Sequence, residues 1–515
     1  MKVQISKKFF STCLVLLLLI SALPYLWGVI NQGDAYRFGG FLLNPIDGNS
    51  YLAKMYEGWL GNWSFTLPYT AQLGQGAYLF LFYLFLGHFA RWVGLPLIVM
   101  FHLARMGGIF LLAFASKHFC EFIFPTNPRA SKAALALVLF GSGLGWIASF
   151  FQLFTSDLWV AEAYPFLSAF SSPHFTIGIA IVLWVFILTN QKPNLKNALL
   201  LFISGLLLSA IMPFDFVITA IVITVALLWS AIETRQFMWQ PFVSFGIGGG
   251  LYLTYQYWII LSTPLLSGWN AQNVTPAPAF LNFVLSFSPA LILAIWGLWS
   301  ALRQHEEFPI KLLLVWLVLA PVLIYLPFSL QRRFMAGYYI PVAILAVYAI
   351  YVALSRTRPA LNPNKIFIPV FIVSILTNVI VLFSGLYGAQ AHNQLLYLSK
   401  DEDAAISWIK ANTPQDAIIL ASPQIGTFIP ALTGRHVLWG HPFETVNSDI
   451  VEKEVIQFYS GSVSEIEQNT YLQTNRVNYL FLGPRERQMG SPSIIKDLTP
   501  VYQNASVSLY QVTEP

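Results

Sequence analysis

The sequence contains few charged residues. Only 10% of its 515 residues are Asp, Glu, Lys or Arg, whereas an average soluble domain carries about 25%. A chain of this length with so little charge cannot cover a globule with a solvated surface, which excludes a soluble enzyme for most of the length. A disordered protein is also excluded, because 56% of the residues are hydrophobic. A polytopic membrane protein is the class that remains.

Cysteines and common catalytic signatures are scarce as well. The two cysteines, Cys13 and Cys120, lie far apart in the sequence, so no disulfide framework is predicted. The sequence has no GxGxxG, Walker A, GxSxG, CxxC or HExxH motif and no fixed-period repeat. It also has no basic stripe with interleaved aromatic residues. The net charge of +5 therefore indicates basic loops on the inner side of a membrane rather than nucleic-acid binding.

Long apolar runs dominate residues 1–388. The first run, 9–30, follows Lys2, Lys7 and Lys8 and has no clear small-residue cleavage site, so it predicts an uncleaved span rather than a signal peptide. Ten further runs are long enough to cross roughly 30 Å of hydrocarbon. They are 97–118, 131–152, 175–190, 198–212, 214–231, 241–262, 280–302, 312–327, 338–355 and 366–388. The segment 77–95 leaves open a short span, a re-entrant piece or an interfacial helix. We predict a mainly α fold, a polytopic transmembrane bundle of about 11–13 spans.

The basic residues predict the orientation of these spans. With the N-terminus inside and one net crossing over 77–118, fourteen basic residues fall in inside loops and four in outside loops. Those inside are Lys2, Lys7, Lys8, Lys117, Arg129, Lys132, Lys192, Lys196, Arg235, Arg303, Lys311, Arg356, Arg358 and Lys365. Those outside are Arg37, Lys54, Arg332 and Arg333. The positive-inside rule therefore predicts a multi-pass protein with a cytoplasmic N-terminus and an extracytoplasmic C-terminus.

The first outside loop, 31–76, contains a predicted short helix. Over 49–60, Tyr51, Met55 and Trp59 recur at helical spacing within a polar and aromatic sequence. This pattern is typical of an amphipathic helix that lies on a membrane surface.

The composition changes near residue 388. Residues 389–515 hold most of the acidic residues and predict a soluble, extracytoplasmic α/β domain, because helices and strands alternate along them. The expected helices are 401–411, 425–432, 448–459 and 464–472. The expected strands are 417–421, 436–439, 477–482, 499–503 and 506–512, the last two joined at Asn504-Ala505.

Acids and a pair of arginines gather on the predicted outer face. Asp47 lies in the first loop, Asp157, Glu162 and His174 in the second, and Asp215 follows Pro213. Arg332 and Arg333 are basic residues outside, against the rule. Carboxylates can act as a general base or bind a divalent cation, and arginine binds phosphate through two parallel hydrogen bonds.

Two short segments add a family resemblance. The stretch DGNSYLAKM (47–55) resembles the acidic first-loop motif of the GT-C superfamily, and GRHVLWGHPFET (434–445) is similar to a segment in the outer domains of many of its members. These are polytopic glycosyltransferases that use sugars linked to a polyprenyl phosphate. One departure is that the first-loop acid is often followed by further acids, whereas here Gly48 and Asn49 follow.

The resemblance implies a role for each candidate residue. Asp47 would be the catalytic base, and Asp157, Glu162 and His174 would bind the acceptor or a metal, either Mg or Mn. Arg332 and Arg333 would bind the lipid phosphate, and His441 and Thr445 would contribute from the outer domain. The partners would be a lipid-linked sugar donor, membrane lipids and a glycan, lipid or protein acceptor. Direct displacement with a base opposite the leaving group predicts inversion at the sugar carbon.

Structural roles and other functions remain open from the sequence. Asp47 is equally suited to be the N-cap of the helix that follows it. Acids at span ends often only face water, and arginines there often extend to lipid headgroups. A transporter or lipid-carrier flippase is the main alternative function, although such proteins usually show internal repeats. A non-catalytic membrane scaffold with a partner-binding outer domain is the third.

Overall fold

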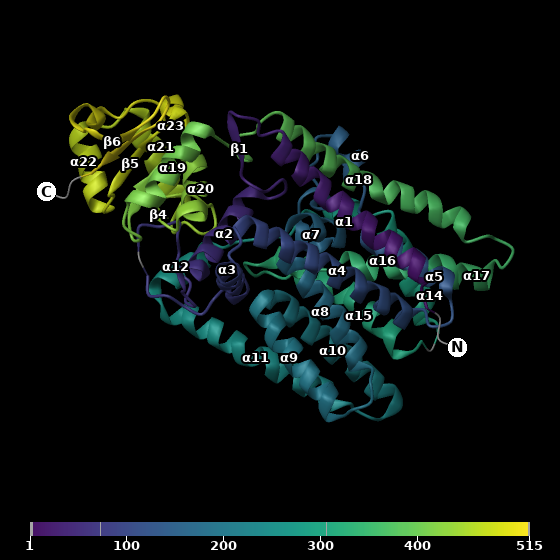
Figure 1. The fold of residues 1–515 in the computed structure, drawn as a ribbon. Coiled ribbons are helices and arrows are strands. Elements are labelled where there is room, and N and C mark those ends of the chain that lie inside the picture. The colour runs from purple at the N-terminus through teal and green to yellow at the C-terminus, as the bar shows by residue number, and fades with distance from the viewer. Residues whose placement is uncertain (1–3, 73, 305, 513–515) are drawn as a thin grey trace. The chain divides into compact units, whose positions relative to one another are not determined.

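The computed structural model describes residues 4–72, 74–304 and 306–512, so that Lys2, which we counted among the inside basic residues, lies outside the described residues. These residues form two compact units (Figure 1). The first contains the described residues up to Pro24 together with His102–Tyr255 and Val274–Gly385. The second contains Tyr25–Phe101, Gln256–Asn273 and the described residues from Leu386 onward.

The first unit is helical. Its α-helices, four of which include residues of both units, are α1 (Lys7–Ile30), α4 (Leu97–Ile123), α5 (Pro128–Phe140), α6 (Gly145–Phe150), α7 (Pro165–Ser171), α8 (Pro173–Thr189), α9 (Leu195–Ile211), α10 (Pro213–Thr234), α11 (Trp239–Ser262), α13 (Phe280–Phe287), α14 (Ala290–Leu302), α15 (Phe308–Ile324), α16 (Tyr339–Tyr348), α17 (Leu354–Thr357) and α18 (Asn364–Gln390). Short 3₁₀ turns are η1 (Ser156–Leu158), η2 (Ala161–Ala163) and η3 (Gln331–Met335), and η4 (Ala349–Ala353) is a π-helical turn.

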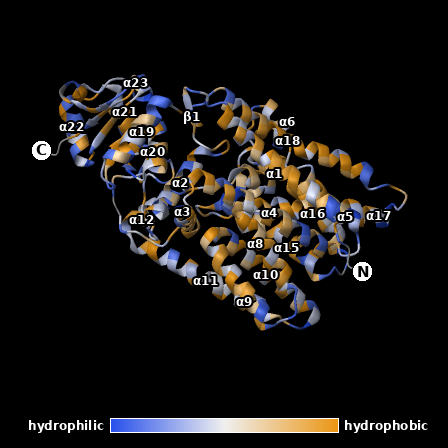
Figure 2. Ribbon diagram, in the orientation of Figure 1, coloured by the Kyte–Doolittle hydropathy of each residue, from blue (hydrophilic) through white to orange (hydrophobic). Residues whose placement is uncertain are grey.

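Six stretches among the described residues are long and apolar enough to cross a membrane. They are Lys7–Ile30, Leu97–Ile123, Pro128–Phe150, Pro213–Thr234, Gln331–Thr357 and Asn364–Gln390. The pair α13 and α14, bent by 86°, gives a seventh if it forms one span, and α8, α9 and α15 are shorter apolar helices. Figure 2 shows the long helices mostly in the hydrophobic colour. The helical bundle is confirmed, but fewer helices meet the length and composition test than the 11–13 spans we expected.

The second unit combines the first loop with the C-terminal region. Its helices are α2 (Pro45–Leu60), α3 (Leu81–Val93), α12 (Pro264–Gln272), α19 (Lys400–Asn412), α20 (Pro423–Thr433), α21 (Ser448–Ser460), α22 (Glu465–Thr474) and α23 (Pro484–Met489), with η5 (Ser493–Asp497) as a 3₁₀ turn. Strand β1 (Tyr36–Phe38) pairs antiparallel with β2 (Tyr397–Ser399). This pairing was not predicted, because nothing local in either segment identifies the other.

A five-stranded sheet organises the C-terminal region. Strand β3 (Ile418–Leu420) pairs in parallel with β4 (His436–Val437) and β5 (Tyr479–Leu482). Strand β7 (Ser508–Gln511) continues antiparallel to β5 and pairs with β6 (Pro500–Gln503), which gives the order β4-β3-β5-β7-β6. Every helix and strand that we predicted after residue 400 is present, with small shifts at the ends.

Helices cover both faces of this sheet. Because side chains alternate along a strand, Ile419 and Phe481 pack with α19 and α20, whereas Leu420 and Leu480 pack with α21 and α22. The first of these clusters also contains Ala53 of α2 and the buried Tyr69. The core of the α/β region is therefore completed by residues of the first loop. The boundary predicted at residue 388 lies near the unit boundary at Gly385, while the division into a membrane and an outer domain stays a prediction.

The predicted surface helix in the first loop is instead packed on both sides. Helix α2 begins earlier than expected, at Pro45, and contacts both α3 and α20. Most of its residues from Gly48 to Gly58 are buried, so it does not present one broad face to a membrane surface. The prediction of an interfacial amphipathic helix is wrong, because the apolar positions pack against protein on more than one side. Helix α3, within the ambiguous segment 77–95, is 13 residues long and does not meet the length test for a span.

Candidate active site

Asp47 lies in the first turn of α2 in the second unit. The helix begins at Pro45 after Asn44, which adopts a left-handed conformation with φ 50°. Asp47 is therefore not the N-cap, and the capping role that the sequence left open is wrong. Its side chain is 45% exposed. A carboxylate in the first helical turn is stabilised by the partial positive charge there.

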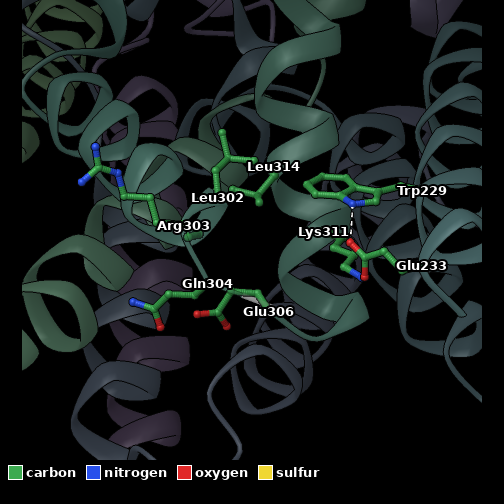
Figure 3. Close-up of a pocket in the computed structure, with 9 residues that line it drawn as sticks. Trp229, Glu233, Leu302, Arg303, Gln304, Glu306, Lys311 and Leu314 are labelled. Atoms are coloured by element: carbon green, nitrogen blue, oxygen red, sulfur yellow. Dashed lines mark hydrogen bonds and ion pairs between the residues drawn. The ribbon is translucent and has the colours of Figure 1, made fainter.

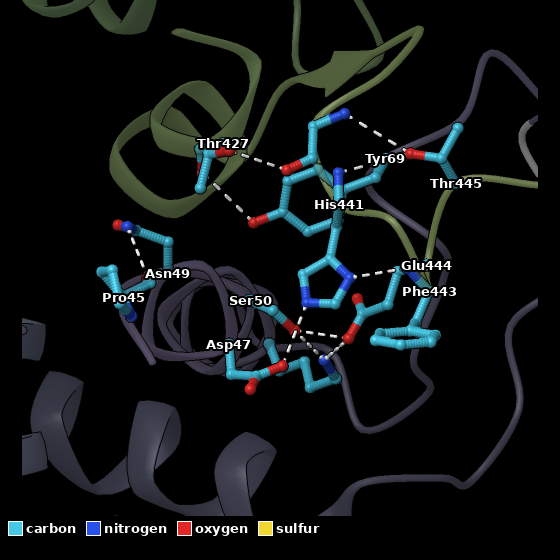
Figure 4. Close-up of polar contacts among 12 residues, drawn as sticks. Pro45, Asp47, Asn49, Ser50, Tyr69, Thr427, His441, Phe443, Glu444 and Thr445 are labelled. Carbon is cyan, nitrogen blue, oxygen red and sulfur yellow. Dashed lines mark hydrogen bonds and ion pairs between the residues drawn. The ribbon is translucent and has the colours of Figure 1, made fainter. Parts of the chain in front are cut away.

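The His441 side chain contacts Asp47 within this unit (Figure 4). The His441 Nε2 atom lies 3.3 Å from Asp47 Oδ1, and the imidazole is buried. The backbone N–H of Phe443 donates to His441 Nδ1 at 3.1 Å. Because Nδ1 accepts this bond, the proton of the neutral ring resides on Nε2, and Nε2–H donates to the Asp47 carboxylate. The geometry thus gives one oxygen of Asp47 a fixed donor.

A buried ion pair lies next to this contact. Lys54 of α2, whose side chain is 0% exposed, places Nζ 2.5 Å from Glu444 Oε1. The same ammonium donates to Ser50 Oγ at 2.5 Å, and the Ser50 hydroxyl donates to Glu444 Oε1. The Lys54 Nζ atom also lies 4.5 Å from the centre of the Phe80 ring. A lysine buried this completely requires such a partner, because an unpaired charge would be very costly there.

The pKa values of the buried groups follow from this arrangement. Burial by itself raises the pKa of the Glu444 carboxyl, but the charge of Lys54 and the hydrogen bonds from Lys54 and Ser50 outweigh it and hold the pKa below its usual value. Burial, together with the charges of Glu444 and Asp47, raises the pKa of the Tyr69 hydroxyl well above its usual value. Tyr69 therefore stays protonated and donates to the Thr427 carbonyl oxygen at 3.3 Å.

The segment that carries His441 is fixed from several sides. Thr445 Oγ1 accepts from the N–H groups of Gly440 and His441, each at 3.4 Å. The Gln272 side chain of α12 donates to the Thr445 carbonyl oxygen and accepts from Asn447 N at 2.8 Å. Thr445 therefore stabilises the backbone that carries His441. The hydrogen bonds described for Thr445 do not include one to Asp47.

Asp157, in the first unit, is engaged by its own loop. Its Oδ2 accepts from Gly145 N at 2.8 Å and its Oδ1 from Thr155 Oγ1 at 2.6 Å, and the residue is fully buried. Burial raises the pKa of this carboxyl, while these hydrogen bonds oppose the rise. Such an acid fixes the path of the chain between α6 and η1.

Glu162 and Arg333 form an ion pair in the first unit. Arg333 Nη1 lies 3.6 Å from Glu162 Oε1, and the arginine side chain is 36% exposed whereas the glutamate side chain is 7% exposed. Asp215, in the first turn of α10, is also buried. The structure therefore brings one predicted phosphate-binding arginine together with one predicted second-loop acid.

The remaining predicted residues have other surroundings. The Arg332 guanidinium lies 4.3 Å from the centre of the Trp159 ring, and its backbone N–H donates to the Thr275 carbonyl oxygen. The His174 ring lies 3.9 Å from that of Phe175 at the start of α8. Neither geometry by itself indicates a ligand.

The predicted divalent cation does not fit the residues as they are placed. Within the described ranges 4–72, 74–304 and 306–512, no group of three or more His, Cys, Asp or Glu side chains could hold a metal ion. Both oxygens of Asp157 accept from protein donors, and Glu162 pairs with Arg333. No step below is routed through a metal, and metal binding stays a prediction.

A pocket of about 350 Å³ lies elsewhere in the first unit (Figure 3). Its charged lining residues are Glu233, Arg303, Glu306 and Lys311. Lys311 pairs with Glu233, and Glu306 Oε1 lies 3.6 Å from Arg356 Nη1. None of the predicted site residues lines this pocket, and these ion pairs already balance much of its charge.

Sequence reasoning missed Lys54 and Glu444. A signal was present, because Asp47, Ser50 and Lys54 are spaced i, i+3 and i+7 and so share one face of a helix. Glu444 also follows His441 by three residues within the segment that carried the resemblance.

Comparison with known proteins addresses the fold. No protein-family model matches the sequence, and no curated protein is similar to it in sequence. Among solved structures, the oligosaccharyltransferase AglB from Archaeoglobus fulgidus, in complex with an inhibitory peptide and a dolichol-phosphate, has a TM-score of 0.54 at 14% identity. The match covers 92% of this chain and 69% of that one. The chain has the GT-C fold.

Two other enzymes with the GT-C fold are similar to this chain. ArnT from Cupriavidus metallidurans, bound to undecaprenyl phosphate, has a TM-score of 0.55 at 11% identity, with 96% of this chain and 97% of that chain covered. The arabinofuranosyltransferase AftD from Mycobacteria has a TM-score of 0.52 at 16% identity, with 100% and 42% covered. The fold that the two short segments suggested is therefore confirmed.

Proposed function

We propose that this protein is an inverting glycosyltransferase. It takes a sugar from a polyprenyl-phosphate carrier and transfers it to a hydroxyl or other nucleophile of a glycan, lipid or protein on the outer membrane face. The observation that carries the proposal is the half-exposed Asp47 carboxylate fixed by the Nε2–H group of His441. The GT-C fold supports it, because the similar AglB and ArnT structures contain dolichol-phosphate and undecaprenyl phosphate.

The proposed reaction is a single displacement at the anomeric carbon. The acceptor oxygen attacks this carbon while Asp47 takes its proton, and the bond from carbon to phosphate oxygen breaks. The electron pair of that bond leaves with the polyprenyl phosphate. Because attack and departure occur on opposite sides, the configuration inverts, as in inverting glycosidases that use a carboxylate base.

The leaving phosphate requires positive charge. Arg332 and Arg333 are our proposed cations, since arginine matches phosphate oxygens with paired donors. Arg333 is already placed beside the Glu162 carboxylate, so an ion pair would have to be shared or exchanged when a phosphate binds.

Asp47→Asn tests the proposal. Purified protein would be given a panel of radiolabelled undecaprenyl-phosphate and dolichol-phosphate sugars with a membrane acceptor extract. We expect the wild type to transfer label and Asp47→Asn to lose roughly 100-fold or more of the rate, since general base catalysis contributes about 10²–10⁴-fold. The matched control is Asp34→Asn, an exposed acid of the same loop, which should transfer at the wild-type rate.

Other outcomes would favour the alternative functions. An unchanged rate in Asp47→Asn would remove Asp47 from the reaction. A wild-type protein that transfers no sugar but moves labelled lipid carriers between leaflets of a vesicle would be a flippase. A protein that does neither and tolerates replacement of Asp47, Arg332 and Arg333 would be a scaffold.

A further inference from the structure

The buried pair formed by Lys54 and Glu444 has no place in the proposed chemistry. Both side chains are almost fully inaccessible, at 0% and 10% exposure, so neither can touch a substrate. Replacing a buried ion pair by apolar residues of similar size is often neutral or stabilising, which makes such a pair weak evidence for stability. What a buried ion pair does supply is a defined geometry, since its hydrogen bonds are directional.

The pair is connected to Asp47 by two short paths. One path runs along α2, where Asp47, Ser50 and Lys54 share a helical face. The other runs through a turn in which the N–H groups of Glu444 and Thr445 donate to the His441 carbonyl oxygen at 3.3 and 2.9 Å. Fixing the Glu444 carboxylate on α2 therefore also fixes the imidazole opposite Asp47.

We propose that Lys54, Glu444 and Ser50 form a positioning network that holds the His441 imidazole against the Asp47 carboxylate. The network acts on the Asp47 carboxylate through His441, the side chain that donates to it. It keeps the Nε2–H donor directed at Oδ1, which stabilises the charged carboxylate and orients it as the base. This inference rests on the proposed function of Asp47 as that base.

The charged and titratable groups described near Asp47 come from three segments. Lys54 faces the site from α2, Tyr69 from the loop after α2, and His441 and Glu444 from the turn 441–445. Tyr69 stays protonated because its pKa is raised. The donor that His441 provides is therefore the group that most directly stabilises and orients the charged Asp47 carboxylate, since a hydrogen bond to the charged form favours that form.

The test is the double variant K54M/E444M. Methionine keeps the approximate length of both side chains and removes both charges together, which avoids leaving one charge buried alone. We expect kcat to fall roughly 10- to 100-fold, as small misplacements of catalytic groups do, with KM changed less than about threefold. We also expect the acidic limb of the kcat pH profile to move to higher pH.

The matched control removes another buried ion pair in the same unit. Arg485 Nε lies 2.9 Å from Glu402 Oε1, and both side chains are 5% exposed or less. The hydrogen bonds described for these two side chains do not involve the Asp47 site. Arg485 also donates to the carbonyl oxygens of Gln394 and Tyr397, and methionine leaves these acceptors unpaired. The double variant R485M/E402M should therefore lower the melting temperature while keeping kcat per folded molecule and the pH profile. If K54M/E444M keeps the wild-type kcat and profile, or if both variants lose kcat only in proportion to stability, the positioning role is overturned.

Two further measurements keep the test decisive. S50A removes the two hydrogen bonds of the Ser50 hydroxyl, to Glu444 and from Lys54, with little change in volume. If K54M/E444M does not fold, S50A should still shift the acidic limb of the kcat pH profile in the same direction. An unmoved limb would refute the network. NMR of ¹³C,¹⁵N-histidine-labelled protein, with the His441 signal assigned by H441N, needs no substrate. We expect the Nε2–H tautomer in the wild type and a tautomer mixture in S50A or K54M/E444M, while an unchanged signal would count against the network.

Failure of the two proposals can be told apart. If the wild type transfers no sugar from any donor, the proposed function fails, whereas the NMR result still reports on the network. If Asp47→Asn abolishes transfer while K54M/E444M leaves it intact, only the network is wrong.

Discussion

The residues just before Asp47 determine where its carboxylate lies. Asn44 in a left-handed conformation and Pro45 in the first helical turn start α2 upstream of Asp47. Had the helix begun at Asp47, its carboxylate would have been turned toward the N–H groups of its own first turn. Instead, the carboxylate lies beside His441, 394 positions away in the sequence.

Glu444 provides a pH-dependent prediction at the scale of one residue. Its pKa is lower in the folded protein than its usual value of 4.5, so the folded state binds fewer protons than the unfolded one. The stability from the charged carboxylate is therefore fully present above pH 4.5 and is lost as the pH falls through the lower, folded pKa. We expect Glu444→Gln to lower stability by about 3–5 kcal/mol near neutral pH, as breaking a buried pair does.

Thermal unfolding in detergent between pH 3 and 7 measures this effect. The difference in melting temperature between the wild type and Glu444→Gln should shrink as the pH falls, because the protonated wild-type carboxyl resembles the amide. The exposed Glu454→Gln variant should differ little from the wild type throughout. A difference that is constant from pH 3 to 7 would contradict the charged pair.

At the scale of elements, the position of α2 is fixed by its close packing against α3. A Cβ atom on Gly87 of α3 would lie 1.9 Å from the Met55 carbonyl oxygen, and one on Gly58 of α2 would lie 2.0 Å from the Leu84 carbonyl oxygen. Only glycine permits backbones to approach this closely. The crossing of α2 and α3 thus fixes the helix that carries Asp47, Ser50 and Lys54.

Gly87→Ala tests that crossing. The new methyl group meets backbone rather than a flexible side chain, so the helices must separate, at a cost of about 1–3 kcal/mol or more. We expect a lower melting temperature and a reduced transfer rate, since α2 moves with Asp47. In Gly107→Ala of α4, where no heavy atom lies within 4 Å, stability should be unchanged or slightly higher. Equal melting temperatures for the two variants would contradict the close crossing.

At the scale of the whole molecule, orientation in the membrane is the property to test. We predict a cytoplasmic N-terminus and an outer C-terminal region from the basic residues. The native Cys13 and Cys120 are buried, so a cysteine introduced at an exposed position should dominate labelling. A505C should react with a membrane-impermeant maleimide in right-side-out vesicles, and Q191C only after permeabilisation. The reverse pattern would invert the topology.

Much of the fold could be predicted because it depends on local sequence. Apolar runs identified the helical bundle, since burying their side chains in lipid or protein is the only favourable outcome for such segments. In the C-terminal region, the short apolar run of β5 and the acidic first turn of α19 were enough to predict these two elements. The breaks were harder to predict, as in the run 280–302, which bends by 86° between α13 and α14.

The candidate site could be predicted only in part. Asp47 and His441 were predicted as site residues from two short segments. Helical periodicity did not show that Asp47 follows the N-cap of α2, nor that α2 packs against protein on more than one side. The sequence by itself determined a membrane protein with a distinct C-terminal α/β region, because composition and local patterns decide where a chain can be solvated. The tertiary structure decided that Lys54 pairs with Glu444, 390 residues away, and that α2 contributes Ala53 to the core of that region. Contacts between such distant segments depend on how elements pack, and no local pattern records them.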